Sequence, residues 1–240
     1  LSNDKTGLDD VFWADFVEEM VRFHRPETIA AFIAEPISTA NGNHVPSPRY
    51  WQRIREICDT YGIVLIADEV INGFGRTGKW FGFETYGTEP DLVTFAKAVT
   101  NGYMPLGGSL ISQKISDVLL SGGGEFAHGL TYSGHPAACA VALKNIEIIE
   151  EEKILDEVKN KTAPYLKEEW LKLADHPLVG EARIKGLMGA IELCANKETR
   201  ERFSSEGRFI SLDEISAGSL CRDLAINNGL VMRAAVSYTH

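Results

Sequence analysis

The sequence lacks the features that several classes of protein require. Its 240 residues include 24 lysines and arginines against 34 aspartates and glutamates, which gives a formal net charge of −10 at pH 7. Because phosphate backbones and anionic membranes attract basic surfaces, this balance argues against nucleic acid and membranes as partners. The sequence has no uninterrupted apolar run of about 18 residues, and its first residues lack the basic-then-apolar pattern of a signal peptide. The composition is that of a soluble globular protein.

Cysteine is also scarce. The four cysteines lie far apart and form no Cys-x-x-Cys pair. Isolated cysteines within apolar segments are typical of small buried side chains in a reducing compartment, so we expect a cytoplasmic protein. One histidine, His135, stands four residues before Cys139, but a zinc site needs a cluster of such ligands. We therefore predict no metal site.

Apolar runs in the first third of the chain predict a βαβ unit. Residues 28–34 predict a buried strand, which ends where Pro36 prevents further pairing. A capping serine followed by proline predicts the start of an amphipathic helix over residues 48–61. Residues 63–67 are apolar on both faces, as a central strand of a parallel sheet requires. Together these segments favour the α/β class.

The rest of the chain predicts more strands and helices. Two further strands, over residues 92–96 and 107–111, would give a mostly parallel sheet of at least four strands. Later segments predict helices from Pro136, over 155–173 and over 213–228, and strands over 186–193 and 230–232. We expect residues 1–155 to form part of a large domain and residues 156–240 part of a smaller α+β C-terminal domain.

Three ionisable residues stand at the ends of predicted strands, namely Glu35, Asp68 and Lys97. Ligands bind beyond the carboxyl ends of strands in an open parallel sheet, so these residues face one crevice if the strands are neighbours. Taken singly, each has a simpler interpretation as a strand end, a turn or a solvated lysine. A lysine can hold an aldehyde as a Schiff base, and an aspartate can keep a pyridine nitrogen protonated. The pair therefore favours pyridoxal phosphate as a cofactor.

Four stretches of the sequence resemble a known family. They are Ile-Ala-Glu-Pro at 33–36, Ile-Ala-Asp-Glu-Val-Ile-Asn-Gly-Phe-Gly-Arg-Thr-Gly at 66–78, Thr-Phe-Ala-Lys at 94–97 and Thr-Tyr-Ser-Gly-His-Pro at 131–136. In order and spacing they look like class III aminotransferases, the subgroup II or ω-type, which have the fold type I architecture of pyridoxal-phosphate-dependent transferases. The resemblance implies a transaminase that uses pyridoxal 5'-phosphate, an amine donor and a keto-acid acceptor.

The resemblance also implies roles for individual residues at the cofactor. Asp68 would bind the pyridine nitrogen, and Val70 would pack against the ring. Lys97 would form the Schiff base and then move the substrate proton as general base and acid. Thr131 would reach the cofactor phosphate of the neighbouring subunit, which implies a homodimer with shared active sites.

Other positions bear on the substrate. Glu35 matches a carboxylate beside the cofactor and substrate, and Arg233 matches an arginine that pairs with the α-carboxylate, although it could instead be a surface arginine at a strand end. Members that use 2-oxoglutarate commonly have a glutamate where this chain has Ala40, so the resemblance favours pyruvate. Ile71 stands where some members have a glutamine near the phenolic oxygen of the cofactor.

Complete members of the family are longer than this chain, so we expect it to be a fragment. The segment that precedes Leu1 in relatives carries a Gly-Ser-rich loop for the cofactor phosphate. The final residues, 235–240, depart from the family pattern, and we interpret them as an artefact at the edge of a truncated gene. The alternatives to transamination are an aminomutase or decarboxylase of the same fold, a non-catalytic relative, and an inactive fragment.

Overall fold

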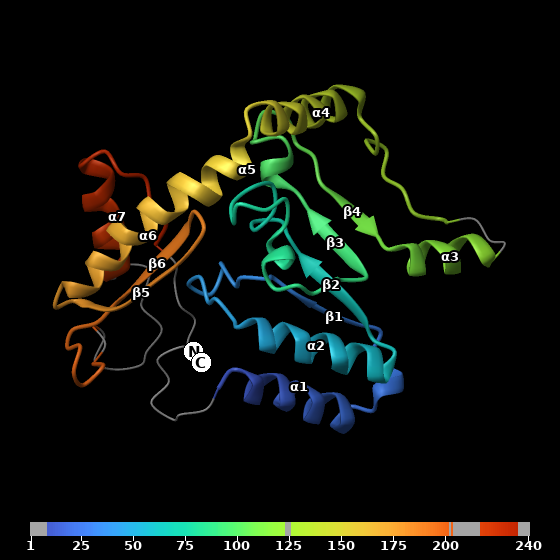
Figure 1. The fold of residues 1–240 in the computed structure, drawn as a ribbon, viewed down its shortest axis with the longest axis horizontal. Helices are drawn as coiled ribbons and strands as arrows, with labels where there is room; N and C mark the ends of the chain where they lie inside the picture. The colour runs from blue at the N-terminus through green and yellow to red at the C-terminus, as the bar shows by residue number, and fades with distance from the viewer. Residues whose placement is uncertain (1–8, 123–125, 202, 204–216, 235–240) are drawn as a thin grey trace.

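The computed structural model describes residues 9–122, 126–201, 203 and 217–234 (Figure 1). A four-stranded sheet with helices forms one part, and a two-stranded hairpin with helices forms the other. The first part contains α1 (Val11–Phe23), η1 (Pro26–Thr28), β1 (Ala31–Ala34), α2 (Pro48–Tyr61), β2 (Val64–Asp68), η2 (Gly82–Thr85), β3 (Leu92–Phe95), η3 (Lys97–Val99), β4 (Gly108–Ile111), α3 (Gln113–Ser121) and α4 (Pro136–Glu151). The second contains α5 (Ile154–Glu157), the π-helix η4 (Val158–Thr162), α6 (Ala163–Lys172), η5 (Leu173–Asp175), β5 (Val179–Lys185), β6 (Met188–Leu193) and α7 (Ala217–Asn227).

The larger sheet has the strand order β1-β2-β3-β4. The first three strands are parallel, with Ala34 opposite Ala67 and Asp68 opposite Thr94. β4 runs antiparallel to β3. The predicted α/β class and mostly parallel four-stranded sheet are therefore confirmed. Because neighbouring parallel strands end at the same edge, the carboxyl ends of β1, β2 and β3 meet there.

Helix α2 forms as its end residues predict. The side chain of Ser47 accepts a hydrogen bond from the N–H of Tyr50 at 3.2 Å, and Pro48 is the first helical residue. Gly62 ends the helix in the left-handed conformation, with φ of +68°. The buried face of α2 packs against the sheet through Trp51, Ile54, Ile57 and Cys58.

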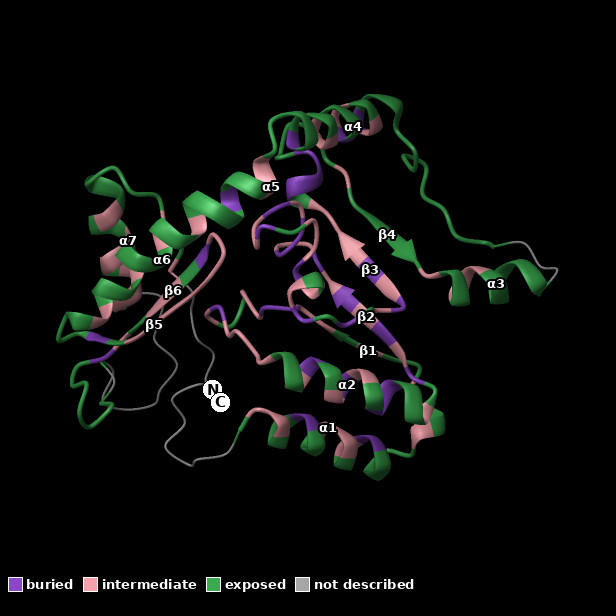
Figure 2. Ribbon diagram, viewed as in Figure 1, coloured by how far each residue is buried: buried purple, intermediate pink, exposed green. Residues whose placement is uncertain are grey.

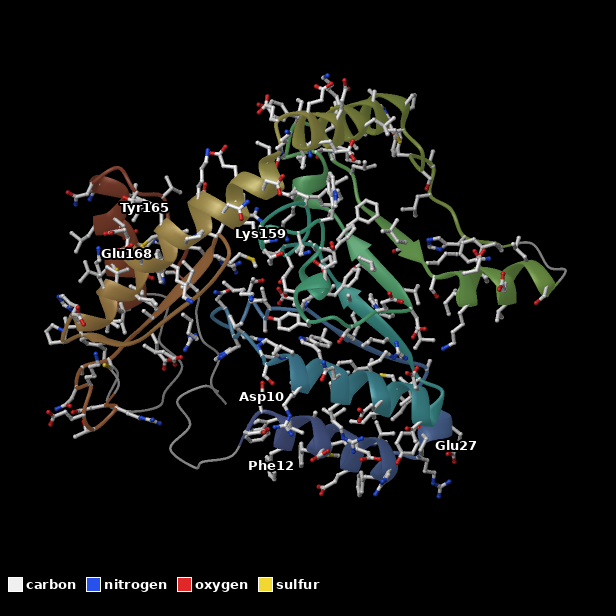
Figure 3. The ribbon with its side chains drawn as sticks, viewed as in Figure 1. Asp10, Phe12, Glu27, Lys159, Tyr165 and Glu168 are labelled. Atoms are coloured by element: carbon white, nitrogen blue, oxygen red, sulfur yellow. The ribbon has the colours of Figure 1, made fainter. Side chains whose placement is uncertain are left out.

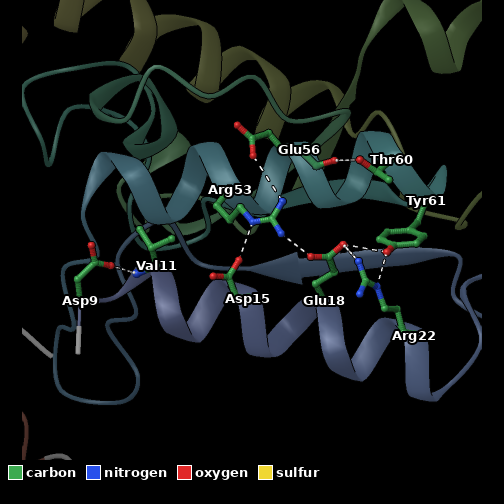
Figure 4. A network of polar contacts seen from close by, with 9 residues as sticks. All are labelled: Asp9, Val11, Asp15, Glu18, Arg22, Arg53, Glu56, Thr60 and Tyr61. Carbon is green, nitrogen blue, oxygen red and sulfur yellow. Dashed lines mark hydrogen bonds and ion pairs between the residues drawn. The ribbon is translucent and has the colours of Figure 1, made fainter. Parts of the chain in front are cut away.

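Helix α1, to which the sequence analysis assigned no element, packs along α2 (Figure 4). Arg53 of α2 forms ion pairs with Asp15, at 2.7 Å, and with Glu18 of α1. The hydroxyl of Tyr61 donates to the Glu18 carboxylate at 2.8 Å and accepts from Nε of Arg22 at 2.7 Å. These contacts join the two helices along their length, while Ala14 and Val21 on the apolar face of α1 belong to the same buried core as α2.

The second part is held to the loops that follow β1 and β2. In the β5–β6 turn, the N–H of Leu187 donates to the carbonyl oxygen of Arg76 at 2.8 Å. The amide of Asn43 donates to the carbonyl oxygen of Met188 at 2.7 Å. Lys159 of η4, labelled in Figure 3, lies against Gly78, where a β-carbon would come within 3.0 Å of the lysine Cβ. The hairpin and the helical run thus brace the loops at the sheet edge.

Some sequence predictions differ from the structure. Residues 230–232 form no strand, because the N–H of Leu230 donates to the carbonyl oxygen of Ala225 and completes the end of α7. Within the described ranges, β5 and β6 pair only with each other, so this apolar run has no neighbouring strand. The predicted domain boundary falls after Leu155, within α5, and stays a prediction. Residues 213–216 and 235–240 lie outside the described residues.

Candidate functional site

Three predicted site residues meet at one edge of the sheet. Glu35 follows β1, Asp68 ends β2, and Lys97 stands two residues after the last residue of β3. Since these strands are parallel neighbours, the expectation that their carboxyl ends adjoin is confirmed.

None of the helices in the described ranges is long and apolar enough to cross a membrane, and in those ranges no three potential metal-binding side chains cluster.

Asp68 is held through one of its two carboxylate oxygens. Its Oδ1 accepts a hydrogen bond from the hydroxyl of Thr94 on β3, at 3.3 Å, and one from the N–H of Val70, at 3.1 Å. Oδ2 makes no hydrogen bond to any residue that the structure describes. The half-buried carboxylate is therefore oriented with one acceptor oxygen still available. The sequence motif alone gives Thr94 no role, whereas the β2–β3 pairing places it directly opposite Asp68.

Lys97 is exposed, and its amine has no hydrogen bond or ion pair within the described ranges. Its backbone has φ of +47°, a left-handed conformation that is uncommon for a residue with a β-carbon and is found at functional sites. The following turn is fixed by α4, because the amide of Asn145 donates to the carbonyl oxygens of Ala98, at 3.0 Å, and Val99, at 3.2 Å. The fold thus anchors the backbone of Lys97 and leaves its side chain available.

Glu35 makes contacts that the sequence analysis did not anticipate. Its carboxylate accepts hydrogen bonds from the N–H of Thr39 at 3.2 Å and of Ala40 at 3.4 Å, and also from the hydroxyl of Thr39. The side chain is therefore folded back onto its own loop. Its predicted place beside the cofactor and substrate stays a prediction.

Two buried polar residues after Asp68 were missed. The amide of Asn72 exchanges hydrogen bonds with Ile37, accepting from its N–H at 3.0 Å and donating to its carbonyl oxygen at 3.1 Å. Glu69 accepts hydrogen bonds from the N–H groups of Gly82 and Phe83, each at 2.8 Å. Burial raises the pKa of Glu69 to about 7, although these two bonds lower it. Glu69 stands directly after β2 and its partners are 13 and 14 residues away, so no local feature of the sequence could have suggested this role.

Thr131 and Arg233 are not brought to the sheet edge by any described contact. Thr131 is exposed in the loop between α3 and α4, and Arg233 is exposed after α7. No hydrogen bond or ion pair between described residues joins either side chain to Asp68 or Lys97. A residue that reaches a neighbouring subunit would be exposed in a single chain, so the role of Thr131 stays a prediction. The role of Arg233 also stays a prediction.

The side chains at the edge fit pyridoxal phosphate chemically. An amine without a partner can condense with the aldehyde, and an oriented carboxylate with one available oxygen can accept the pyridinium N–H. Both groups come from adjacent strands, Asp68 from the end of β2 and Lys97 from just after β3. The chemistry of these two side chains therefore agrees with the cofactor implied by the sequence motifs.

Comparisons with known proteins point to one family. Residues 10–228 match the family model described as Aminotransferase class-III. The chain is 53% identical over 234 residues to the putrescine–pyruvate aminotransferase of Pseudomonas aeruginosa, covering 98% of this chain and 48% of that protein. It is 44% identical over 196 residues to γ-aminobutyrate transaminase 2 of Solanum lycopersicum, covering 80% of this chain and 43% of that protein.

Solved structures agree with this assignment. A thermostable (S)-enantioselective ω-transaminase from Thermomicrobium roseum matches with a TM-score of 0.85 at 41% identity, covering 97% of this chain and 51% of that one. The fold type I architecture is thereby confirmed. The chain spans about half the length of the relatives that it matches. From its motifs, its sheet and these matches, the chain belongs to the class III aminotransferase family.

Proposed function

We propose that the protein transfers an amino group from an amine or ω-amino acid to a keto acid, with pyridoxal 5'-phosphate as its cofactor. The observation that carries the proposal is that Asp68 and Lys97 stand at the ends of adjacent parallel strands. The carboxylate of Asp68 is oriented by hydrogen bonds, and the amine of Lys97 has no partner among the described residues. The family assignment supports it, because the matched relatives are named as aminotransferases and transaminases.

The residues of this chain have distinct tasks in such a reaction. The bound cofactor supplies an electron sink that lets the α-proton of the amine leave. Oδ2 of Asp68 would accept the pyridinium N–H, while Thr94 and Val70 keep the carboxylate from rotating. Nζ of Lys97 would hold the aldehyde carbon and then, once released, accept and return the α-proton. Val70 would support the ring from one side.

Pyruvate is the keto acid that we propose. Ala40 has no carboxylate with which to occupy Arg233, so the guanidinium would be free to grip the α-carboxylate of the substrate. Glu35 adjoins this position, since its carboxylate accepts the N–H of Ala40. The Pseudomonas aeruginosa relative is named for pyruvate and putrescine, which supports pyruvate and suggests a diamine as a donor to test.

The test is an assay of the full-length protein with a panel of amines and two keto acids. We expect pyruvate to be aminated faster than 2-oxoglutarate. We also expect Asp68→Asn to lower kcat on the order of 10²-fold, because it removes the charge opposite the pyridine nitrogen. Asparagine keeps an oxygen for Thr94 and Val70, so folding should be retained. Formation of a decarboxylated or rearranged product without amination of a keto acid would favour the alternative reactions.

We also propose that the protein works as a homodimer, with Thr131 serving the neighbouring site. Support comes from the described residues between β4 and α4, most of which are exposed (Figure 2) and several of which carry large apolar side chains. Leu120 is 78% exposed and Leu130 is 75% exposed, and exposed apolar side chains of this size are a feature of surfaces that bind another protein. Sedimentation of the full-length protein should give a dimer that Leu120→Glu weakens. A wild-type monomer at micromolar concentration would refute this assembly.

A further inference from the structure

The turn after Trp80 is held by two carboxylates that differ in burial. Three consecutive N–H groups, those of Phe81, Gly82 and Phe83, each donate a 2.8 Å hydrogen bond to a glutamate. Glu84 accepts the first and is exposed, whereas Glu69 accepts the other two and is fully buried. The turn is therefore fixed to the residue that follows Asp68 by a carboxylate that water does not reach.

The space around Glu69 permits little movement. A β-carbon on Gly82 would lie 3.2 Å from Oε2 of Glu69 and 3.0 Å from Cβ of Asn72, so the turn approaches as closely as a glycine allows. Asn72 is itself fully buried and bonded to Ile37, in the loop after β1. The segment that follows β2 is thus locked to two other loops, one through Glu69 and one through Asn72.

An aromatic cluster connects this turn to the end of β3. Phe81 packs edge-on against Phe74, with ring centroids 5.6 Å apart, and Phe74 packs in the same way against Phe95 at 5.8 Å. Phe95 is the last residue of β3 and stands two positions before Lys97. Contacts therefore run from Glu69 through the turn and these three rings to the strand that carries the lysine.

We propose that Glu69 is a positioning residue for the cofactor, which anchors the 81–83 turn so that the strand ends bearing Asp68 and Lys97 keep their relative placement. Both oxygens of the Glu69 carboxylate bind the turn, Oε2 the N–H of Gly82 and Oε1 that of Phe83. Its effect is exerted through the two N–H groups that it holds. The assignment rests on the proposed function, since it supposes that Asp68 and Lys97 bind pyridoxal phosphate.

Glu69→Gln and Glu84→Gln form a matched pair for the test. Each replaces a carboxylate that accepts N–H bonds from the same turn with a neutral amide of nearly the same size. Glutamine has one acceptor oxygen, so at position 69 its NH₂ group would face one of the two N–H groups that Glu69 holds. At position 84, the exposed N–H can be satisfied by water. Only the first change should disturb the site.

The full-length protein is measured with and without pyridoxal phosphate. In the cofactor-free protein, we expect Glu69→Gln to speed amide hydrogen exchange over residues 94–99 about tenfold. The same change should weaken pyridoxal phosphate binding about tenfold or more, and lower kcat at saturating cofactor while the KM for the amine stays within about twofold. Glu84→Gln should leave all these values within about twofold of wild type.

One result would rule out this role. If Glu69→Gln lowers the unfolding temperature but leaves exchange over 94–99 and cofactor affinity unchanged, Glu69 supports the fold alone and the proposal is wrong. If Glu69→Gln does not fold, Glu69→Asp takes its place, because aspartate keeps the charge but is too short to reach both N–H groups. Its exchange over residues 94–99 and its cofactor affinity then decide the outcome. A wild-type protein that neither binds pyridoxal phosphate nor transaminates would refute the proposed function, while the exchange measurement would still test the anchoring.

Discussion

Replacing Lys97 with alanine is expected to lower kcat of the full-length protein on the order of 10³-fold or more, since the lysine both holds the cofactor and moves the proton. The amine has no partner within the described ranges and the side chain is exposed, so the free energy of unfolding of the cofactor-free protein should change by no more than about 0.5 kcal/mol. Alanine retains a β-carbon, and the anchor that Asn145 provides for the following turn is untouched. Activity and stability should therefore separate.

The control for this change is Lys79→Ala. Lys79 is also exposed, in the loop after β2, but has no predicted role at the cofactor. Its variant should keep wild-type kcat and stability. If Lys97→Ala keeps more than about a tenth of the wild-type kcat, Lys97 is not the lysine on which the chemistry depends.

Replacing Gly186 with alanine is expected to cost about 3 kcal/mol or more in the free energy of unfolding. Gly186 has φ of +60°, and a β-carbon there would lie 2.2 Å from the carbonyl oxygen of Arg76 and 2.8 Å from Cα of Thr77. That carbonyl oxygen also accepts the N–H of Leu187. The added atom would push the 76–77 loop off the β5–β6 turn and break this bond, and denaturant unfolding measures the loss.

Gly62→Ala separates steric overlap from backbone strain. Gly62 has φ of +68°, nearly that of Gly186, but no atom lies within 4 Å of where its β-carbon would stand. Only the left-handed conformation is then penalised, at about 1 kcal/mol. Equal losses in the two variants would show that the hairpin does not pack against the loop as described.

The sequence predicted the sheet edge well because its information there is local. Each element there is marked by residues only a few positions away. A proline follows Glu35 just after the end of β1, apolar runs precede Asp68 and Lys97, and capping residues stand at the ends of α2. The fold places these ends together because adjacent parallel strands share an edge. Asp68 and Lys97 could therefore be named before any geometry was known.

The parts that escaped prediction depend on distant partners. Glu69 bonds to residues 13 and 14 positions away, and Asn72 to one 35 positions away, so no short motif contains both halves of either contact. The bonds of Glu35 to Thr39 and Ala40 are local instead, and its expected place beside the cofactor stays a prediction. Residues 230–232 have the apolar pattern of a strand but no described strand to pair with, and pattern alone does not supply a neighbour.

Reduction followed by peptide mapping shows which lysine binds the cofactor. The full-length protein is loaded with pyridoxal phosphate, treated with borohydride to make the lysine linkage permanent, digested and examined by mass spectrometry. We expect one major modified peptide, with the pyridoxyl group on Lys97, and none in Lys97→Ala. A modification on another lysine, or labelling that survives in Lys97→Ala at the wild-type level, would contradict it.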